Sequence, residues 1–493
     1  MSSSVLLSGG TIIAFNKETE ELNVIRNGAL LIINDRIAGI YDTPHPSDVP
    51  ADAEVVDCTH KIITPGFVDT HRHGWQTALK TLSPNTTLAD YLFRYRGQEA
   101  AAVYTAEDVY IGQLAGLLEA LNAGVTTTLD HAHHLWSSDR MKAGLQGSID
   151  SGARVFWSPA FGTVNEYTIS DQIADFRKLA ATKSKEDDLT TLGIAYDYWT
   201  FASEEETRAV ISLAKEVEIP VLTTHYVGGA WGPSKTVGDS SPELLHSLGI
   251  LDVPSAVVFS HGAALTPNGA RLLRSTNQYI SITPESEMHY GHGHAHAHLA
   301  QDQSALGVDT HLTFSSDVLT QTRLWLQRTR SRLYDEVLEH WEVPANNPMS
   351  VNQAFQLATR QGGLALRRPD LGVLAVGAKA DVVVFDGRSP ALLGWVDPVA
   401  AVILHAGVGD MVHVLVDGKF QKRDGKLTFP GYEGVVERFL KSAEKIQDAL
   451  TQNPAPVLEG AMFGISPYGR AVEVNAQRGE STGYGTQFTD RGK

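Results

Sequence analysis

The pattern of hydrophobic and polar positions divides the chain into segments of different character. From residue 3 to about residue 60, short runs of β-branched and aliphatic residues are broken by Gly, Asn and Asp, which is the pattern of short strands. Asn34-Asp35 lies between two of these runs and predicts a hairpin turn. The sequence therefore predicts a small β unit near the N-terminus.

The middle of the chain alternates between apolar runs and amphipathic segments. Thr105-Ala106-Glu107-Asp108 resembles a capping box and predicts a helix through Leu121, and the run 125–130 predicts a buried strand after it. The alternation continues to a strand that ends near Val308, which makes roughly eight strand–helix steps in about 300 residues. That is the size expected of a (β/α)8 barrel.

Strand patterns return after the barrel, at 380–385 and 412–418. We therefore predict that one β unit is built from both chain ends and is interrupted by the barrel. An amphipathic helix is predicted at 432–450. The Gly-rich, polar stretch 453–493 predicts an extended or partly disordered tail, and an arm onto a neighbouring subunit of a homo-oligomer is one interpretation of it. The predicted divisions are 1–61 and 366–430 for two parts of a β-sandwich, 62–365 for the barrel, and 431–493 for the helix and tail.

Composition limits the partners. The chain has 493 residues, a hydrophobic fraction of 42% and a charged fraction of 20%, which is typical of globular proteins. Its formal charge of −17 argues against a nucleic acid or an anionic membrane surface as partner and favours a small molecule. Cys58 is the only cysteine, so no intrachain disulfide can form, and no window fits a signal peptide or a membrane span. We therefore expect a cytoplasmic protein.

Histidines and an aspartate follow the predicted strands, where the active sites of such barrels lie. His71 and His73 alternate at the end of the first strand and so project from the same face. His225 follows the fifth strand, His261 the sixth and Asp309 the eighth. Three imidazole nitrogens and a carboxylate oxygen suit Zn²⁺, with Fe²⁺ or Mn²⁺ as alternatives, and leave one position for water.

A bound divalent ion would activate a water molecule, so hydrolysis is the expected activity. Zinc lowers the pKa of its water to about 7. A carboxylate such as Asp309 can take the proton, while an imidazole such as His261 holds the resulting hydroxide or polarises a substrate carbonyl.

The strand ends also resemble a known family. The run from Pro65 to His73, the pairs Thr224-His225, Ser260-His261 and Val308-Asp309, and the closing segment 372–385 resemble the amidohydrolase superfamily, more narrowly its cytosine deaminase-like and triazine hydrolase branch. The resemblance covers about residues 3 to 430 and implies a distorted (β/α)8 TIM barrel with a composite β-sandwich from both chain ends. It also implies one metal ion per chain bound by His71, His73, His225 and Asp309, with His261 and Asp309 catalytic.

Two details refine this resemblance. Binuclear members bridge their metals with a carboxylated lysine after strand four, but residues 195–199 read Ala-Tyr-Asp-Tyr-Trp, so a mononuclear site is expected. Deaminases of the branch carry a glutamate three residues after the strand-five histidine, where this chain has Gly228. Glu285 or Glu287, after strand seven, is a candidate replacement, with a supporting or loop role as the alternative for each.

Other residues of the same rim predict a flat aromatic or heterocyclic substrate, although aromatic residues at such positions often only pack. Gln76 matches a glutamine that is often found in the branch and can hydrogen-bond substrate. The segment after strand seven either lines the pocket or forms a solvated loop, and one of His131, His133 and His134 can reach the substrate. The predicted substrate-binding residues are Trp75, Gln76, Trp199, Tyr226, Glu285, His289 and His292.

We therefore predict a mononuclear metal-dependent hydrolase that attacks a C–N bond of an amide, lactam or amino-substituted heterocycle with metal-activated hydroxide. The missing glutamate leaves open a lyase or decarboxylase that uses the same ion. The third hypothesis is a barrel that has lost turnover and serves as a binding scaffold, although the complete set of ligands argues against it.

Overall fold

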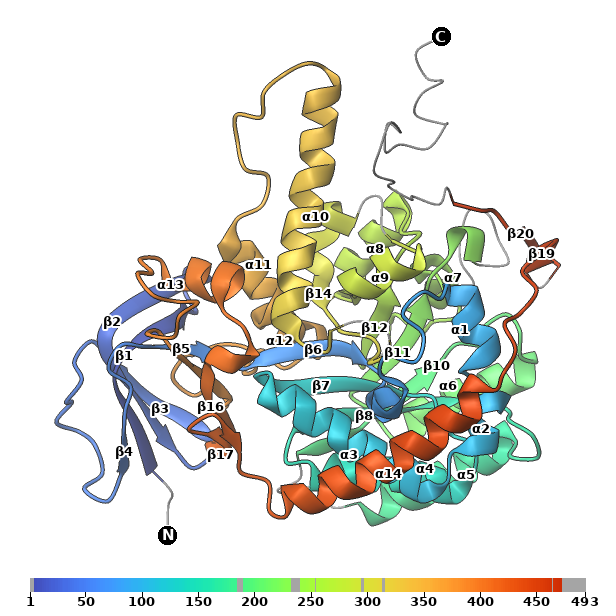
Figure 1. The fold of residues 1–493 in the computed structure, drawn as a ribbon, viewed down its shortest axis with the longest axis horizontal. Coiled ribbons are helices and arrows are strands. Elements are labelled where there is room, and N and C mark those ends of the chain that lie inside the picture. The colour runs from blue at the N-terminus through green and yellow to red at the C-terminus, as the bar shows by residue number, and fades with distance from the viewer. Residues whose placement is uncertain are drawn as a thin grey trace, which may run out of the picture.

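The computed structural model describes residues 4–183, 189–231, 240–252, 254–293, 297–312, 315–462 and 464–471. Its centre is a parallel sheet with the strand order β14-β13-β12-β11-β10-β8-β7-β6, in which β9 also pairs with β8 (Figure 1). The strands are β6 (Phe67–Arg72), β7 (Val125–Ala132), β8 (Arg154–Phe161), β9 (Thr190–Leu192), β10 (Ile194–Tyr196), β11 (Val221–Tyr226), β12 (Ala256–His261), β13 (Tyr279–Ile282) and β14 (Ser304–Leu306).

The first and last strands meet at the seam of this sheet. The backbone N–H groups of Val308 and Asp309 donate to the carbonyl oxygen of His71 at 3.1 and 2.8 Å. The sheet therefore curls into a nearly closed barrel, which confirms the predicted fold. The seam also places the residues that follow β14 directly beside the end of β6.

Helices connect and surround these strands. The predicted capping box at Thr105 is present, because its hydroxyl accepts from the backbone of Asp108 and the Asp108 carboxylate accepts from the backbone of Thr105. The helical elements up to β14 are η1 (Gly74–Leu79), α1 (Leu88–Arg94), α2 (Gln98–Val103), α3 (Ala106–Asn122), α4 (Ser138–Asp150), α5 (Ile169–Thr182), α6 (Glu204–Glu216), η2 (Gly229–Trp231), α7 (Pro242–Ser247), α8 (Pro267–Thr276), α9 (Pro284–Tyr290) and η3 (Ala297–Gln303). Those after β14 are α10 (Val318–Glu339), α11 (Val351–Ala358), α12 (Arg360–Ala365), α13 (Pro398–Ala400), η4 (Ala401–His405), η5 (Val408–Asp410) and α14 (Tyr432–Thr451).

A second, mixed sheet combines strands from both chain ends, as predicted. Its order is β18-β17-β16-β15-β5-β1-β2-β3, with β4 beside β1. Arg154 of β8 ties it to the barrel through a buried ion pair with Asp381 and a partly buried one with Asp417. The strands are β1 (Ser4–Asn16), β2 (Glu21–Ile33), β3 (Arg36–Tyr41), β4 (Glu54–Asp57), β5 (Lys61–Pro65), β15 (Val382–Asp386), β16 (Met411–Val416), β17 (Lys419–Arg423) and β18 (Lys426–Leu427).

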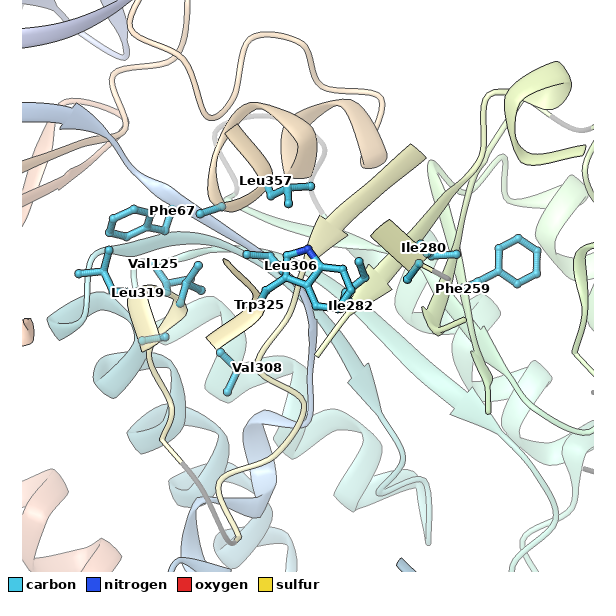
Figure 2. Close-up of a cluster of buried hydrophobic side chains, with 14 of the residues drawn as sticks. Phe67, Val125, Phe259, Ile280, Ile282, Leu306, Val308, Leu319, Trp325 and Leu357 are labelled. Atoms are coloured by element: carbon cyan, nitrogen blue, oxygen red, sulfur yellow. The ribbon is translucent and has the colours of Figure 1, made fainter. Parts of the chain in front are cut away.

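The largest hydrophobic cluster fills the space between barrel strands and helices. Figure 2 shows Leu306 of β14 and Ile282 of β13 close to Trp325 of α10, with Leu357 of α11 nearby. All four side chains are at most 2% exposed. This packing fixes the strands whose carboxyl ends carry the candidate site.

The C-terminal helix lies against the barrel. Asp108 of α3 accepts from Ser442 of α14 at 2.7 Å and pairs with Lys445, and Gln447 donates to the carbonyl of Ala78 in η1 at 2.8 Å. A short hairpin of β19 (Ala461–Met462) and β20 (Ser466–Pro467) follows. Among the helices of the described residues, none combines the length and apolarity that a membrane crossing needs.

Candidate metal centre and its surroundings

Two buried histidines at the end of β6, His71 and His73, begin the candidate site. Nδ1 of His73 lies 2.7 Å from the backbone carbonyl oxygen of His131. Because a carbonyl oxygen only accepts, His73 carries its proton on Nδ1 and its Nε2 has a free lone pair. Nδ1 of His71 lies 2.8 Å from Ser260 Oγ. Each ring is thus held through Nδ1, which leaves Nε2 for the site.

A third imidazole comes from His225 at the end of β11. Its Nε2 lies 3.3 Å from Nε2 of His73. Its Nδ1 lies 2.9 Å from Oδ2 of Asp197, and its backbone N–H donates to Oδ1 of the same carboxylate at 2.8 Å. Because Asp197 accepts both bonds, it fixes the ring with Nδ1 protonated and Nε2 available as a ligand.

Asp309 completes the set from the seam of the barrel. Its Oδ1 lies 3.3 Å from Nε2 of His71 and 3.1 Å from Nε2 of His73. Its Oδ2 accepts a hydrogen bond from Ser286 Oγ at 2.6 Å. The two carboxylate oxygens therefore differ, since one faces the imidazoles and the other faces the first turn of α9.

His261, at the end of β12, stands beside this group. Its ring centroid lies 5.2 Å from that of His71 and 5.6 Å from that of His225. Both His261 and Asp309 have a φ of 75°, a left-handed conformation that is uncommon for residues other than glycine. Strained backbone of this kind concentrates at functional sites. The catalytic roles of both residues stay predictions.

These side chains fit a divalent cation. Ligand atoms of His71, His225, His261 and Asp309 all lie within 4.8 Å of one another, and His73 joins them through the contacts above. Nε2 of His71 is buried without a hydrogen-bond partner among the described residues. A buried lone pair that faces imidazole nitrogens and a carboxylate oxygen is what a metal ligand requires.

The protonation states also suit a metal. Burial lowers the pKa of His71 well below its ordinary value and lowers that of His225 to about 3. Burial alone would raise the pKa of Asp309, but the neighbouring imidazoles of His71 and His73 hold it well below the ordinary range. Metal ions bind neutral imidazoles and ionised carboxylates, and these are the forms that the folded protein favours.

Two predicted substrate residues lie on η1, immediately after His73. Gln76 donates from Nε2 to the hydroxyl of Tyr91 at 2.7 Å, and its Oε1 is buried with no hydrogen bond in the described part of the chain. Trp75 donates from its indole nitrogen to Nδ1 of His133 at 3.2 Å and packs edge-on against Trp136. Gln76 thus offers a free acceptor, whereas Trp75 belongs to the aromatic packing behind the site.

Trp199 and Tyr226 are held in the barrel wall. The indole nitrogen of Trp199 donates to Thr224 Oγ1 at 3.0 Å, and the hydroxyl of Tyr226 donates to the carbonyl of Ala264 at 2.8 Å. Both rings belong to the largest hydrophobic cluster. Contact of these residues with substrate stays a prediction.

The residues after strand seven separate into different environments. Glu285 Oε2 accepts from the backbone and hydroxyl of Ser315 at 3.1 and 2.6 Å and from Gln321 at 3.0 Å, so it anchors the segment before α10. His292 is 5% exposed, and its ring lies edge-on to that of His261, 4.7 Å away.

His289 packs instead against the ring of Tyr290 at 4.9 Å. Of the predicted residues of this segment, the structure therefore brings His292 to the candidate centre, while His294 and His296 lie outside the described residues.

The strand-two histidines lie beside the centre. Nε2 of His131 is 3.2 Å from Asp197 Oδ2, and the ring of His133 lies 4.0 Å from that of His73. His134 is farther back, between Trp136 and Trp157. Burial lowers the pKa of His131 to about 4 and that of His134 to about 3.

Sequence reasoning missed two residues of this region. Asp197 directly follows strand four, so the strand-end rule that located the histidines could have found it. Arg96, between α1 and α2, brings a guanidinium 3.9 Å from Asp197, has a 30% exposed side chain and makes no hydrogen bond within the described residues. No sequence pattern marked Arg96, because it lies outside the strand ends.

This chain resembles known proteins in sequence and in fold. Residues 62–420 match the model of the amidohydrolase family. A 5-methylthioadenosine/S-adenosylhomocysteine deaminase of Pyrococcus horikoshii is 25% identical over 402 residues, which cover 78% of this chain and 89% of that protein.

Solved structures share the fold. A zinc-bound adenosine deaminase from Xanthomonas campestris has a TM-score of 0.76 at 18% identity and covers 90% of this chain and 99% of its own. The zinc complex of atrazine chlorohydrolase from Arthrobacter aurescens has a TM-score of 0.75 at 18% identity, with 89% and 100% covered.

Proposed function

The chain belongs to the amidohydrolase family, and we propose that it is a mononuclear, zinc-dependent enzyme that removes an amino group from a small heterocycle. The coarser activity, metal-dependent hydrolysis of a C–N bond, follows from the family and from relatives that are named deaminases. The observation that carries the proposal is the convergence of His71, His73, His225 and Asp309 at the carboxyl ends of the barrel strands.

These four residues are the proposed metal ligands. Zinc held by them would supply Lewis acidity, which lowers the pKa of a bound water to about 7. Asp197 and the carbonyl of His131 hold the rings of His225 and His73 with Nε2 facing the ion. Support for one ion rather than two comes from residues 195–199, after strand four, which contain no lysine to bridge two metals.

The chain's own residues then move protons. Asp309 remains ionised in the folded protein, so it can accept the proton of the attacking water. His261 lies beside it, and its Nε2 can accept a hydrogen bond from the attacking water or from the leaving amine. Hydrolysis adds the water oxygen to the ring carbon, breaks the C–N bond and returns protons to the departing nitrogen, which leaves as ammonia.

The proposed substrate is a flat, amino-substituted ring. Relatives are named for adenosine derivatives and a structural neighbour for atrazine. Gln76 Oε1 is a buried acceptor without a partner in the described residues, which suits an amino group. Trp75, Trp199, Tyr226, Glu285, His289 and His292 remain proposed substrate-contacting or wall residues.

The test is product analysis with zinc-loaded enzyme. Adenosine, 5-methylthioadenosine, guanine and melamine would each be incubated, and ammonia and the ring product measured. Zinc-dependent ammonia release from any of them supports the proposal. In a parallel incubation with a carboxylated heterocycle, release of CO2 without ammonia would favour the lyase alternative. A protein that binds no metal would favour the scaffold.

We also propose that the chain acts in the cytoplasm as a homo-oligomer. The single cysteine, Cys58, is buried, and burial raises the pKa of its thiol to about 12. Helix α10 projects from the body of the molecule (Figure 1), and near its tip Trp341 is 98% and Val343 86% exposed. Sedimentation of the wild type and of Trp341→Glu would test self-association, and a wild-type monomer would contradict it.

A further inference from the structure

His261 differs from the other histidines of the centre in what holds it. Its Nδ1 lies 2.9 Å from the hydroxyl oxygen of Thr283, the residue that follows β13. The nearest carboxylate oxygen, Oε1 of Glu287, lies 3.8 Å from the same nitrogen. All three side chains are at most 4% exposed. His261 therefore reaches a carboxylate through an intervening hydroxyl group.

The directions of these hydrogen bonds can be derived. The backbone N–H of Thr283 can only donate, and it donates to Oε1 of Glu287 at 2.8 Å. The Thr283 hydroxyl donates its one proton to the same oxygen at 3.3 Å. Its lone pairs are then left to accept, so Nδ1 of His261 must carry the proton that it donates to Thr283. Nε2 of His261 is consequently unprotonated and faces the candidate metal centre.

We propose that Thr283 and Glu287 are positioning residues that hold His261 with Nδ1 protonated and Nε2 free. Neither residue touches the reacting atoms, and both act through His261. The kinetic consequence rests on the proposed function, whereas the position of the proton does not. The arrangement also gives Glu287 a role other than direct proton transfer to a substrate ring.

The same turn of α9 reaches Asp309. Ser286, between the two glutamates, donates to Asp309 Oδ2 at 2.6 Å. Glu285 is directed elsewhere, to Ser315 and Gln321. One short helical turn thus holds both proposed catalytic side chains, His261 through Glu287 and Asp309 through Ser286. Among the two glutamates of the turn, the geometry selects Glu287 as the partner of His261.

The direct test is the protonation of the His261 ring in zinc-loaded protein. Histidine labelled with ¹⁵N distinguishes protonated from unprotonated ring nitrogens by NMR, and the His261 signal is assigned by its loss in His261→Asn. We expect Nδ1 protonated and Nε2 unprotonated in the wild type. A protonated Nε2 in the wild type would overturn the proposal, whether or not any substrate is known.

Variants separate positioning from simple support of the helix. Thr283→Val removes the hydroxyl but keeps the backbone N–H that bonds Glu287, so α9 keeps its first turn. We expect Thr283→Val to mix the two ring tautomers, Thr283→Ser to restore the wild-type state, and Glu287→Gln to weaken the preference. The control is Thr266→Val, which removes the hydroxyl that begins α8 and contacts Glu243, away from the centre.

Kinetics give the second readout once a substrate from the panel releases ammonia. Thr283→Val should lower kcat roughly 10- to 100-fold with little change in KM, and should shift the pH profile of kcat. Thr266→Val should change neither. If Thr283→Val keeps both the wild-type tautomer and the wild-type kcat, the positioning role is refuted. If no substrate of the panel reacts, the proposed function fails, but the NMR result still decides this proposal.

Discussion

Two groups of histidines lie at the same end of the barrel but have different surroundings. In the first group, His71, His73 and His225 turn Nε2 toward one another and toward Asp309. In the second group, at the end of β7, His133 and His134 pack mainly on rings, and only His131 meets a carboxylate, that of Asp197. Asp197 is shared, because it contacts His225 and His131.

The difference shows that the number of histidines does not make a metal site. The first group has its Nδ1 atoms held from behind and its Nε2 atoms directed at a common carboxylate. His134, in the second group, is just as buried, yet its two ring nitrogens have no hydrogen-bond partner among the described residues. We therefore expect four changes to have effects of decreasing size on activity or stability. In order, they are removal of the metal and substitution of Asp309, of Asp197 and of His134.

Removal of the metal should have the largest effect. We expect dialysis against a chelator to abolish turnover and to lower the melting temperature, because an ion that binds only the folded chain stabilises it. Addition of about one equivalent of zinc should restore both properties. Metal content, turnover and melting temperature measured on one preparation would check this. Full activity in demonstrably metal-free protein would contradict the metal centre.

Asp309→Asn should come next. The amide cannot accept a proton as the carboxylate does, so we expect turnover to fall at least about 1000-fold while the circular dichroism spectrum is unchanged. Asp302→Asn is the matched control, because Asp302 forms an exposed ion pair with Arg274 and lies away from the centre. Turnover by Asp309→Asn at the wild-type rate would remove Asp309 from the mechanism.

The barrel could be predicted because local and long-range signals agree. Thr105 and Asp108 cap α3 as their spacing predicts. Each candidate metal ligand was predicted from its position immediately after an apolar run. Partnerships were harder to predict. That Asp197 holds His225, and Thr283 holds His261, depends on distances between strands that are set only when the barrel closes.

Some local signals were present but were not used. No helix was predicted at residues 284–290, but they form α9, and Pro284 at its first position is a common helix start. Helix α10 was missed as well, although Asp317 caps it. Ser286, Glu287 and Glu285 have different partners because they lie on one helical turn. These partners could not be predicted without knowing that the segment was helical.

Asp197→Asn tests the residue that the two groups share. The amide retains one acceptor oxygen but loses the negative charge that orients His225. We expect zinc affinity to fall roughly 10- to 100-fold, with turnover recovered at higher zinc concentration. Competition with a chromophoric chelator would measure the affinity. An unchanged affinity would show that Asp197 does not support His225 as a metal ligand. Asp197 would then not couple the two groups of histidines.

His134→Gln should have the smallest effect, which appears only in acid. Burial lowers the pKa of His134 to about 3, whereas in the unfolded chain it is about 6.5. Between these values the unfolded chain binds a proton at this residue that the folded chain does not, so the free energy of unfolding falls as the pH is lowered from 6.5 toward 3. At pH 5 this amounts to about 2 kcal/mol. Urea unfolding of metal-free protein at pH 7.5 and pH 5 should therefore show a loss that is about 2 kcal/mol smaller in His134→Gln than in the wild type. The exposed His340→Gln serves as the control, and equal losses in wild type and His134→Gln would mean that His134 takes up a proton within the folded protein.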